Sequence, residues 1–149
     1  MSIVVNIYGQ GQLRMQQQQT NTDLEVCDLF LALATNVYTP DKDLHDFWND
    51  VVANEVATGN GYVTNGFDVT GATYSYDSAS DQVRLDIGDP TWTFTAGKTW
   101  RYGILYERTS GTDATRQLFA LLTWDSDQTV STAYTLTIDP TGLLFWDVT

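Results

Sequence analysis

The sequence predicts a single all-β domain covering residues 1–149: an antiparallel β-sandwich, of jelly-roll or related Greek-key type, with one short helix near residues 43–52. A chain of 149 residues matches the usual size of one domain. It holds 22 Thr and 16 Asp but only 3 Glu. Thr favours strands and Asp favours turns, whereas Glu favours helices. With 42% hydrophobic residues the chain has enough apolar material for a core, which excludes intrinsic disorder.

Apolar and polar residues alternate along much of the chain, which indicates half-buried strands. The first strand is expected at residues 3–7, and a long buried strand at 24–34, where the alternation passes into the run LFLALA. The Asn65-Gly66 pair predicts a hairpin turn within 62–76, because both residues tolerate positive φ. Further strands are expected at 83–87, 92–94, 100–106, 118–124, 134–138 and 143–148. Such closely spaced short strands are typical of a sandwich or barrel.

Residues 43–52 have the spacing of an amphipathic helix. Their apolar positions fall at i, i+3, i+4 and i+7, and are Leu44, Phe47, Trp48 and Val51. Asp41 or Asp43 is the expected N-cap. We expect this helix to dock on the edge or mouth of the sandwich through its apolar stripe. The segment Tyr8 to Gly11 holds two glycines and is interpreted as a turn.

The charge balance excludes some classes of partner. Nineteen acids against seven bases give a net charge of −12, so no surplus of cations exists to neutralise phosphates, and nucleic acid is not an expected partner. The start of the chain does not have the pattern of a secretory signal, and no apolar run approaches the ~20 residues of a membrane span. The single cysteine, Cys27, is expected to be a buried small hydrophobe in a protein made in a reducing cytoplasm.

The acidic residues offer two kinds of candidate site. The densest cluster consists of Asp41, Asp43, His45, Asp46 and Asp50. It would suit a divalent cation in a metal-dependent hydrolase, but its spacing fits no EF-hand loop, and a capped helix with a solvated acidic face explains it as well. The possible catalytic carboxylate pairs are Asp86 with Asp89, near Asp81, and Asp125 with Asp127. Each pair borders a turn, where Asp commonly caps its own backbone.

No known catalytic motif is present, and the single histidine allows no credible Ser-His-Asp set. We therefore expect no enzyme, and no catalytic, cofactor-binding or metal-binding residues. The five Trp, eight Tyr and six Phe have two interpretations. Exposed rings would stack on sugars, whereas buried rings would fill the core of a small sandwich. Trp92, Trp100 and Trp124 fall in expected strands, which favours the core.

Several segments of the chain resemble a widespread family of small β-rich tailed-bacteriophage virion proteins that are commonly encoded near head genes. The most extensive is VYTPDKDLHDFWNDVVANEV, residues 37–56, followed by Gly61-Tyr62. The other matching positions are Gly71, Thr73, Tyr76-Asp77, the run Val83 to Asp86, Trp92, and the strand from Arg101-Tyr102 to Tyr106. The likeness runs from about Gly9 to the end of the chain. Its motifs are turns and core positions, so it transfers no functional residue.

This resemblance implies a virion structural protein made in the cytoplasm of a bacterial host. The leading hypothesis is a capsid decoration (cement) protein that binds the outside of the major capsid lattice. Its expected partners are the major capsid protein and other copies of itself, as a homotrimer at threefold positions. The alternative is a tail, collar or fibre module that binds a host receptor or glycan. The acidic charge would keep free copies apart before assembly and favours the outer face of the shell, away from DNA.

Residues 1–12 leave two alternatives. Ile3, Val5 and Ile7 alternate with Val4 and Asn6. They form either the first strand of the domain or an extended arm that adds a strand to the sheet of a partner. Ile3, Val5 and Ile7 are accordingly the candidate residues for contact with the capsid or a neighbouring subunit.

Overall fold

The computed structural model describes residues 2–19, 21–109, 111–139 and 142–147, the last four of them by their backbone alone. It confirms a mostly antiparallel β fold with one short α-helix. In chain order the elements are β1 (Ile3–Ile7), α1 (Gly9–Gln16), β2 (Leu29–Ala34), the 3₁₀ turns η1 (Trp48–Asp50) and η2 (Val52–Asn54), β3 (Phe67–Val69), β4 (Thr73–Asp77), β5 (Gln82–Asp86), β6 (Thr91–Thr93), β7 (Lys98–Glu107), β8 (Leu118–Val130), β9 (Ala133–Thr135) and β10 (Leu144–Asp147).

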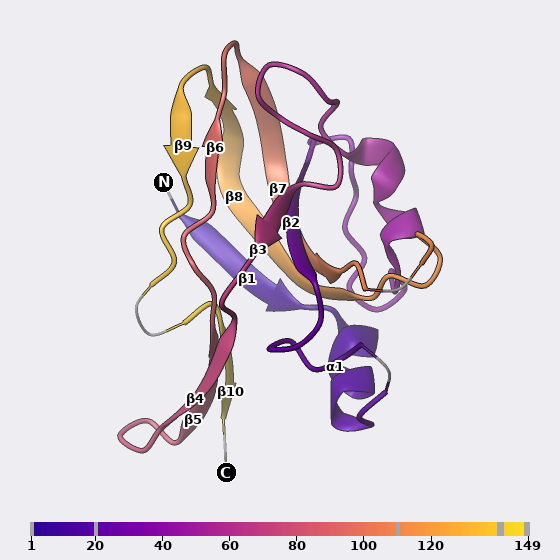
Figure 1. Ribbon diagram of the computed structural model, residues 1–149, viewed down its shortest axis with the longest axis vertical. Helices are drawn as coiled ribbons and strands as arrows, with labels where there is room; N and C mark the ends of the chain where they lie inside the picture. The colour runs from indigo at the N-terminus through magenta and orange to yellow at the C-terminus, as the bar shows by residue number, and fades with distance from the viewer. Residues whose placement is uncertain (1, 20, 110, 140–141, 148–149) are drawn as a thin grey trace.

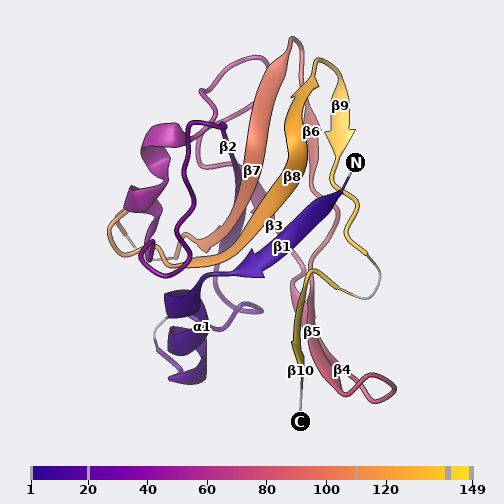
Figure 2. The same cartoon turned by 180° about the vertical axis from the view of Figure 1, so that it is seen from behind.

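The described strands form one large and two small antiparallel sheets. The large sheet has the order β1-β8-β7-β2-β3, and the small ones are β10-β5-β4 and β6-β9. Figure 1 shows β6 and β9 in front of the large sheet, with the β4–β5 hairpin and β10 extending beyond its lower end. Figure 2 shows β1 along the outer edge of the large sheet, beside β8. The arrangement is sandwich-like; a jelly-roll connectivity remains a prediction.

The central strands of the large sheet are buried on both faces. Successive side chains of β2 enter two different apolar clusters, because side chains alternate across a strand. Leu29, Leu31 and Leu33 pack toward the small sheets together with Trp100 and Trp124. Ala32 and Ala34 pack on the opposite face with Tyr38, Trp48 and Val51. Double-sided burial is the reason that LFLALA and residues 118–122 are continuous apolar runs.

The predicted helix over 43–52 is wrong in form, although short 3₁₀ turns occupy part of this range. Trp48 and Val51 are fully buried, as the apolar stripe requires, but Leu44 is 76% exposed. Backbone bonds to other segments replace the helical ones: Trp48 N–H donates to the carbonyl of Arg116. Phe47 forms an isolated bridge to Gln117. Tertiary pairing with the start of β8 has therefore overridden the local helical periodicity.

The α-helix lies instead at Gly9–Gln16, partly where a turn was expected. Its packing on β8 explains why a helix forms here. Gly11 is buried, and a Cβ built there would lie 2.2 Å from the carbonyl oxygen of Leu118, so only glycine allows the helix to approach β8 this closely. A helix of eight residues with two glycines has little stability of its own, which is why the sequence pattern did not reveal it.

Three strand predictions also need correction. The strand expected at 24–34 begins only at Leu29, because the Asp23 carbonyl accepts the N–H groups of Val26 and Cys27 in a turn. The 62–76 hairpin does not form: β3 pairs with β2 and β4 with β5, although Asn65 and Gly66 do adopt positive φ. Strand β8 passes through Asp125 and Asp127, which were expected to border a turn.

Candidate functional site

The acidic cluster at residues 41–50 binds its own backbone. One carboxylate oxygen of Asp41 accepts the N–H groups of Asp43 and Leu44 at 3.0 and 3.1 Å. One oxygen of Asp50 accepts those of Asp46 and Phe47 at 2.9 and 3.1 Å. Within the described residues no group of three or more His, Cys, Asp or Glu is placed to hold a metal ion.

The only histidine belongs to a chain of tyrosine hydroxyls on the buried side of this segment. The Tyr8 and Tyr38 hydroxyls lie 3.0 Å apart, and that of Tyr38 is 2.7 Å from Nδ1 of His45. Burial raises the pKa of Tyr8 and raises that of Tyr38 to about 12. Both phenols therefore stay protonated, and the chain connects α1, by way of the residue before it, to the 38–45 loop.

The carboxylates considered as catalytic pairs have separate polar partners. Asp89 accepts the backbone N–H of Ile138 at 2.8 Å. Asp81 accepts the Tyr76 hydroxyl at 2.7 Å. Asp125 accepts the N–H of Ser2 at 3.1 Å, which lowers its pKa, and Asp127 accepts the side-chain amide of Asn36 at 2.7 Å. Asp86 lies opposite Thr73 in the β4–β5 ladder. These contacts fix turns and strands, and they do not bring two carboxylates together around a cleft.

The tryptophans with described side chains belong to the core, as expected for those in strands. Trp48, Trp100 and Trp124 are 0% exposed and Trp92 is 5% exposed. Trp48 stacks on Tyr106 with centroids 4.1 Å apart and planes at 8°. Trp100 contacts Trp124 edge-to-face. These four rings therefore offer no stacking platform to a sugar.

A partly buried carboxylate that the sequence did not single out fixes the loop before β3. Glu55 accepts the Tyr62 hydroxyl at 2.8 Å and the Asn65 N–H at 2.5 Å. The Tyr62 hydroxyl in turn accepts the N–H of Leu33, on β2, at 3.0 Å. Desolvation raises the pKa of Glu55 to about 7, against the effect of both hydrogen bonds. The network has a structural role. The only hint of it in the sequence is that Glu is rare in this chain, with three residues in all.

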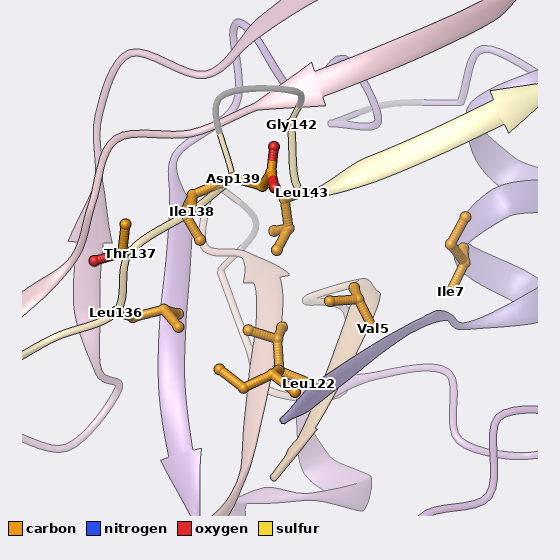
Figure 3. A pocket seen from close by; sticks show the side chains of 10 residues that line it. Val5, Ile7, Leu122, Leu136, Thr137, Ile138, Asp139, Gly142 and Leu143 are labelled. Atoms are coloured by element: carbon orange, nitrogen blue, oxygen red, sulfur yellow. The ribbon is translucent and has the colours of Figure 1, made fainter. Parts of the chain in front are cut away.

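An apolar groove of about 520 Å³ lies beside β1. One wall consists of Ile3, Val5 and Ile7, and Leu122 of β8 lies next to them. The opposite wall is formed by described residues after β9, among them Leu136, Ile138 and Leu143 (Figure 3). Among the described residues that line the groove, Asp139 is the only charged one. The sequence pointed to the β1 residues, but it placed Leu136 and Ile138 in a strand, whereas β9 ends at Thr135.

Among the described strands, β1 pairs with β8 along one edge and with none along the other, which we call its open edge. Val5 lies opposite Leu122 in the antiparallel β1–β8 ladder. Hydrogen bonds from Tyr8 N–H to the Phe119 carbonyl and from Asp125 N–H to the Ser2 carbonyl flank this ladder. In an antiparallel ladder, residues that bond to the neighbouring strand alternate with residues that do not. The even-numbered residues of β1 are therefore the ones that bond to β8. The peptide groups of the odd-numbered residues, whose side chains line the groove, therefore point to the open edge.

Residues 3–7 thus form the first strand of this molecule's own sheet, which is the first of the two alternatives; contact with a partner remains a prediction. No helix in the described part of the chain is both long and apolar enough to cross a membrane. Comparison of the chain with protein-family models, with curated proteins and with solved structures found no match in any of the three.

Proposed function

We propose that the protein is a non-enzymatic structural component of a bacteriophage virion, a capsid decoration protein that docks on the outside of the major capsid lattice. The virion assignment is supported by the resemblance of residues 37–56 and the later segments to tailed-phage structural proteins. The single structural observation that carries a docking role is the groove beside the open edge of β1. It is open and lined mainly by apolar side chains, as a protein-binding surface can be.

The charge supports a place on the outer face of the shell. A net charge of −12 opposes approach to packaged DNA. Self-repulsion also keeps free copies soluble before the lattice forms. The proposed partners are therefore the major capsid protein and, at threefold positions of the lattice, two further copies of this chain in a homotrimer.

Locating the protein in virions tests this proposal. DNA-filled heads are separated from tails, and antibody labelling with electron microscopy follows the protein in each fraction. We expect dense, regular labelling over the outer head surface. Absence from purified heads, with labelling confined to tails or fibres, would contradict decoration and favour the receptor- or glycan-binding alternative, which a glycan array would then examine.

A matched pair of variants tests whether the groove is the surface that binds to phage heads. Val5→Asp places a charge on the groove wall, whereas Val4→Asp places the same charge one residue earlier, at a side chain that is 56% exposed. Heads stripped of the protein are incubated with each purified variant after its thermal melt is recorded. We expect Val4→Asp to rebind like wild type and Val5→Asp to lose rebinding while remaining folded at the assay temperature.

A further inference from the structure

We propose that Asn60 is a site of spontaneous covalent modification, at which the side-chain amide is lost as ammonia and replaced by an aspartate or isoaspartate carboxylate while the protein stays folded. The chain contains two Asn-Gly pairs, Asn60-Gly61 and Asn65-Gly66, and only the first is placed to react. The inference is independent of the proposed docking function, because neither pair lines the groove beside β1.

The reaction takes place between a side chain and the next backbone nitrogen. Asparagine is one of the thermolabile residue types, and a following glycine has no Cβ to obstruct the attack. The Gly61 nitrogen attacks the side-chain carbonyl carbon of Asn60, and the bond from that carbon to the side-chain nitrogen breaks. The Gly61 proton leaves with this nitrogen as ammonia. Water then opens the cyclic imide at one of its two carbonyls, so water is the only co-reactant and nothing is oxidised or reduced.

The exposed turn at residues 59–62 leaves the attacking nitrogen accessible. Gly59 and Tyr62 exchange two backbone hydrogen bonds, at 2.9 and 3.1 Å. Asn60 and Gly61 lie between them with φ of 52° and 87°, as the central residues of a type I′ hairpin turn do. Both residues are exposed, and the Gly61 N–H has no acceptor among the described residues. The nucleophile of the reaction therefore already faces water.

Few contacts hold this turn to the rest of the molecule. The Asn60 carbonyl accepts the N–H of Thr95 at 3.0 Å. Gly61 lies against Thr93, whose carbonyl oxygen a Cβ at this position would strike. The attack requires the Gly61 nitrogen to come within about 3–3.5 Å of the Asn60 side-chain carbon, so the turn must open. Such an opening breaks the Thr95 bond and the bonds of the turn itself, and a local opening costs far less than global unfolding.

The second Asn-Gly pair is fixed by buried groups. The Gly66 N–H donates to the Val63 carbonyl at 3.1 Å, so here the attacking nitrogen is engaged. The Asn65 carbonyl accepts the Tyr106 hydroxyl at 2.9 Å, and Tyr106 is fully buried. The Asn65 N–H donates to Glu55 at 2.5 Å. Opening this turn disturbs the core, so we expect Asn65 to react only when the protein unfolds.

Incubation in heavy-oxygen water followed by peptide mapping tests the assignment. The folded protein is kept in mildly alkaline buffer below its melting temperature, and a parallel sample is kept in guanidinium chloride. Both are then digested in ordinary water with chymotrypsin, which cleaves after Tyr62 and so places the two asparagines in different peptides. Heavy oxygen in a new carboxylate shows that the amide was lost during the incubation and not during digestion.

We expect Asn60 to react at least about tenfold faster than Asn65 in the folded protein, and both to react at rates within about twofold of each other in guanidinium chloride. Asn60→Asp and Asn65→Asp are a matched pair of variants, since aspartate also tolerates positive φ. Ion-exchange chromatography of the folded variants follows the gain of negative charge with time. Asn65→Asp should continue to form a more acidic species at the wild-type rate, and Asn60→Asp should not.

Three outcomes would overturn the assignment. The first is an equal rate at the two pairs in the folded protein, or reaction at Asn65 alone. The second is an Asn60 amide that stays intact in the folded protein over a period in which guanidinium chloride allows its complete loss. The third is an acidic shift that continues in Asn60→Asp, which would place the reaction at another residue. None of these results bears on where the protein lies in a virion, so the docking proposal is tested separately.

Discussion

Replacing the partly buried carboxylate Glu55 by glutamine should stabilise the protein in alkali and leave it unchanged in acid. Glu55 accepts hydrogen bonds from the Tyr62 hydroxyl and the Asn65 N–H through one oxygen. The side-chain amide oxygen that Glu55→Gln introduces can accept both bonds. The substitution therefore removes the charge and keeps the contacts that fix the loop to β2.

The size of the effect follows from the pKa. Burial raises the pKa of Glu55 from 4.5 to about 7, so about 2.5 pH units separate the unfolded and folded values. At about 1.36 kcal/mol per unit the upper limit is about 3.4 kcal/mol. The side chain is only partly buried and water screens its charge, so we expect about 1–2 kcal/mol.

The sign follows from proton binding. Between pH 4.5 and 7 the folded protein holds a proton on Glu55 that the unfolded chain has released. The free energy of unfolding therefore falls as the pH rises through this window, and the full penalty is present above pH 7. Because Glu55→Gln carries no titrating group, its advantage over wild type should be near zero at pH 4.5 and reach about 1–2 kcal/mol at pH 8.

Urea unfolding followed by tryptophan fluorescence measures this difference, since the four described tryptophans are buried and report loss of the core. Curves are recorded for wild type and variant at intervals from pH 4.5 to 9. Glu25→Gln is the matched control. Exposed Glu25 also accepts a backbone N–H, from Tyr74 at 2.7 Å, and its substitution removes one negative charge, as Glu55→Gln does. A Glu55→Gln advantage that is independent of pH, or equal to that of Glu25→Gln, would refute the reasoning.

Three further predictions concern the N-terminal strand, a glycine and the cysteine. Deleting residues 1–8 should lower the melting temperature by more than about 10 °C, because β1 pairs with β8 and Tyr8 is fully buried; an unchanged melt would mean that this segment is dispensable, as an arm is. Gly66→Ala should cost about 3 kcal/mol or more in urea unfolding, since φ is +83° and a Cβ would lie 2.3 Å from the Leu31 carbonyl oxygen, whereas Gly111→Ala, with open space around it, should cost little; equal costs would contradict this. Burial raises the pKa of Cys27 to about 12, so at pH 8 its thiol should react with Ellman's reagent at least about a hundredfold more slowly than in urea; similar rates would disprove its protection.

Alternation and composition identified most of the fold because they depend on local rules. Strands β1, β5, β6 and β7 lie where period-2 alternation predicts them, and β10 lies within the strand expected at 143–148. The Asn65-Gly66 pair has the positive φ that its residue types favour. The continuous apolar runs were correctly interpreted as fully buried strands, since a strand covered on both faces has no polar side. Of the candidate groove, the sequence supplied one wall, Ile3, Val5 and Ile7.

The remaining features depend on contacts between distant segments. The periodicity of residues 43–52 is helical, yet the Trp48 N–H donates to the Arg116 carbonyl and the Leu118 N–H donates to the Asp46 carbonyl. These tertiary bonds replace the helix. Conversely, α1 has a weak local pattern and exists because Gly11 lets it pack on β8. Neither outcome can be predicted from helix propensity, because propensity contributes less free energy than a few tertiary hydrogen bonds and contacts.

The sequence by itself thus determined an acidic, all-β domain whose N-terminal strand alternates and whose aspartates mark turns, because propensity and side-chain alternation are properties of neighbouring residues. Only the tertiary structure decided that β1 lies at an open edge and that Leu136, Ile138 and Leu143 face it across a groove. Strand order and the path of the segment after β9 depend on which distant surfaces bury one another, and alternation is the same for an edge strand and a central one.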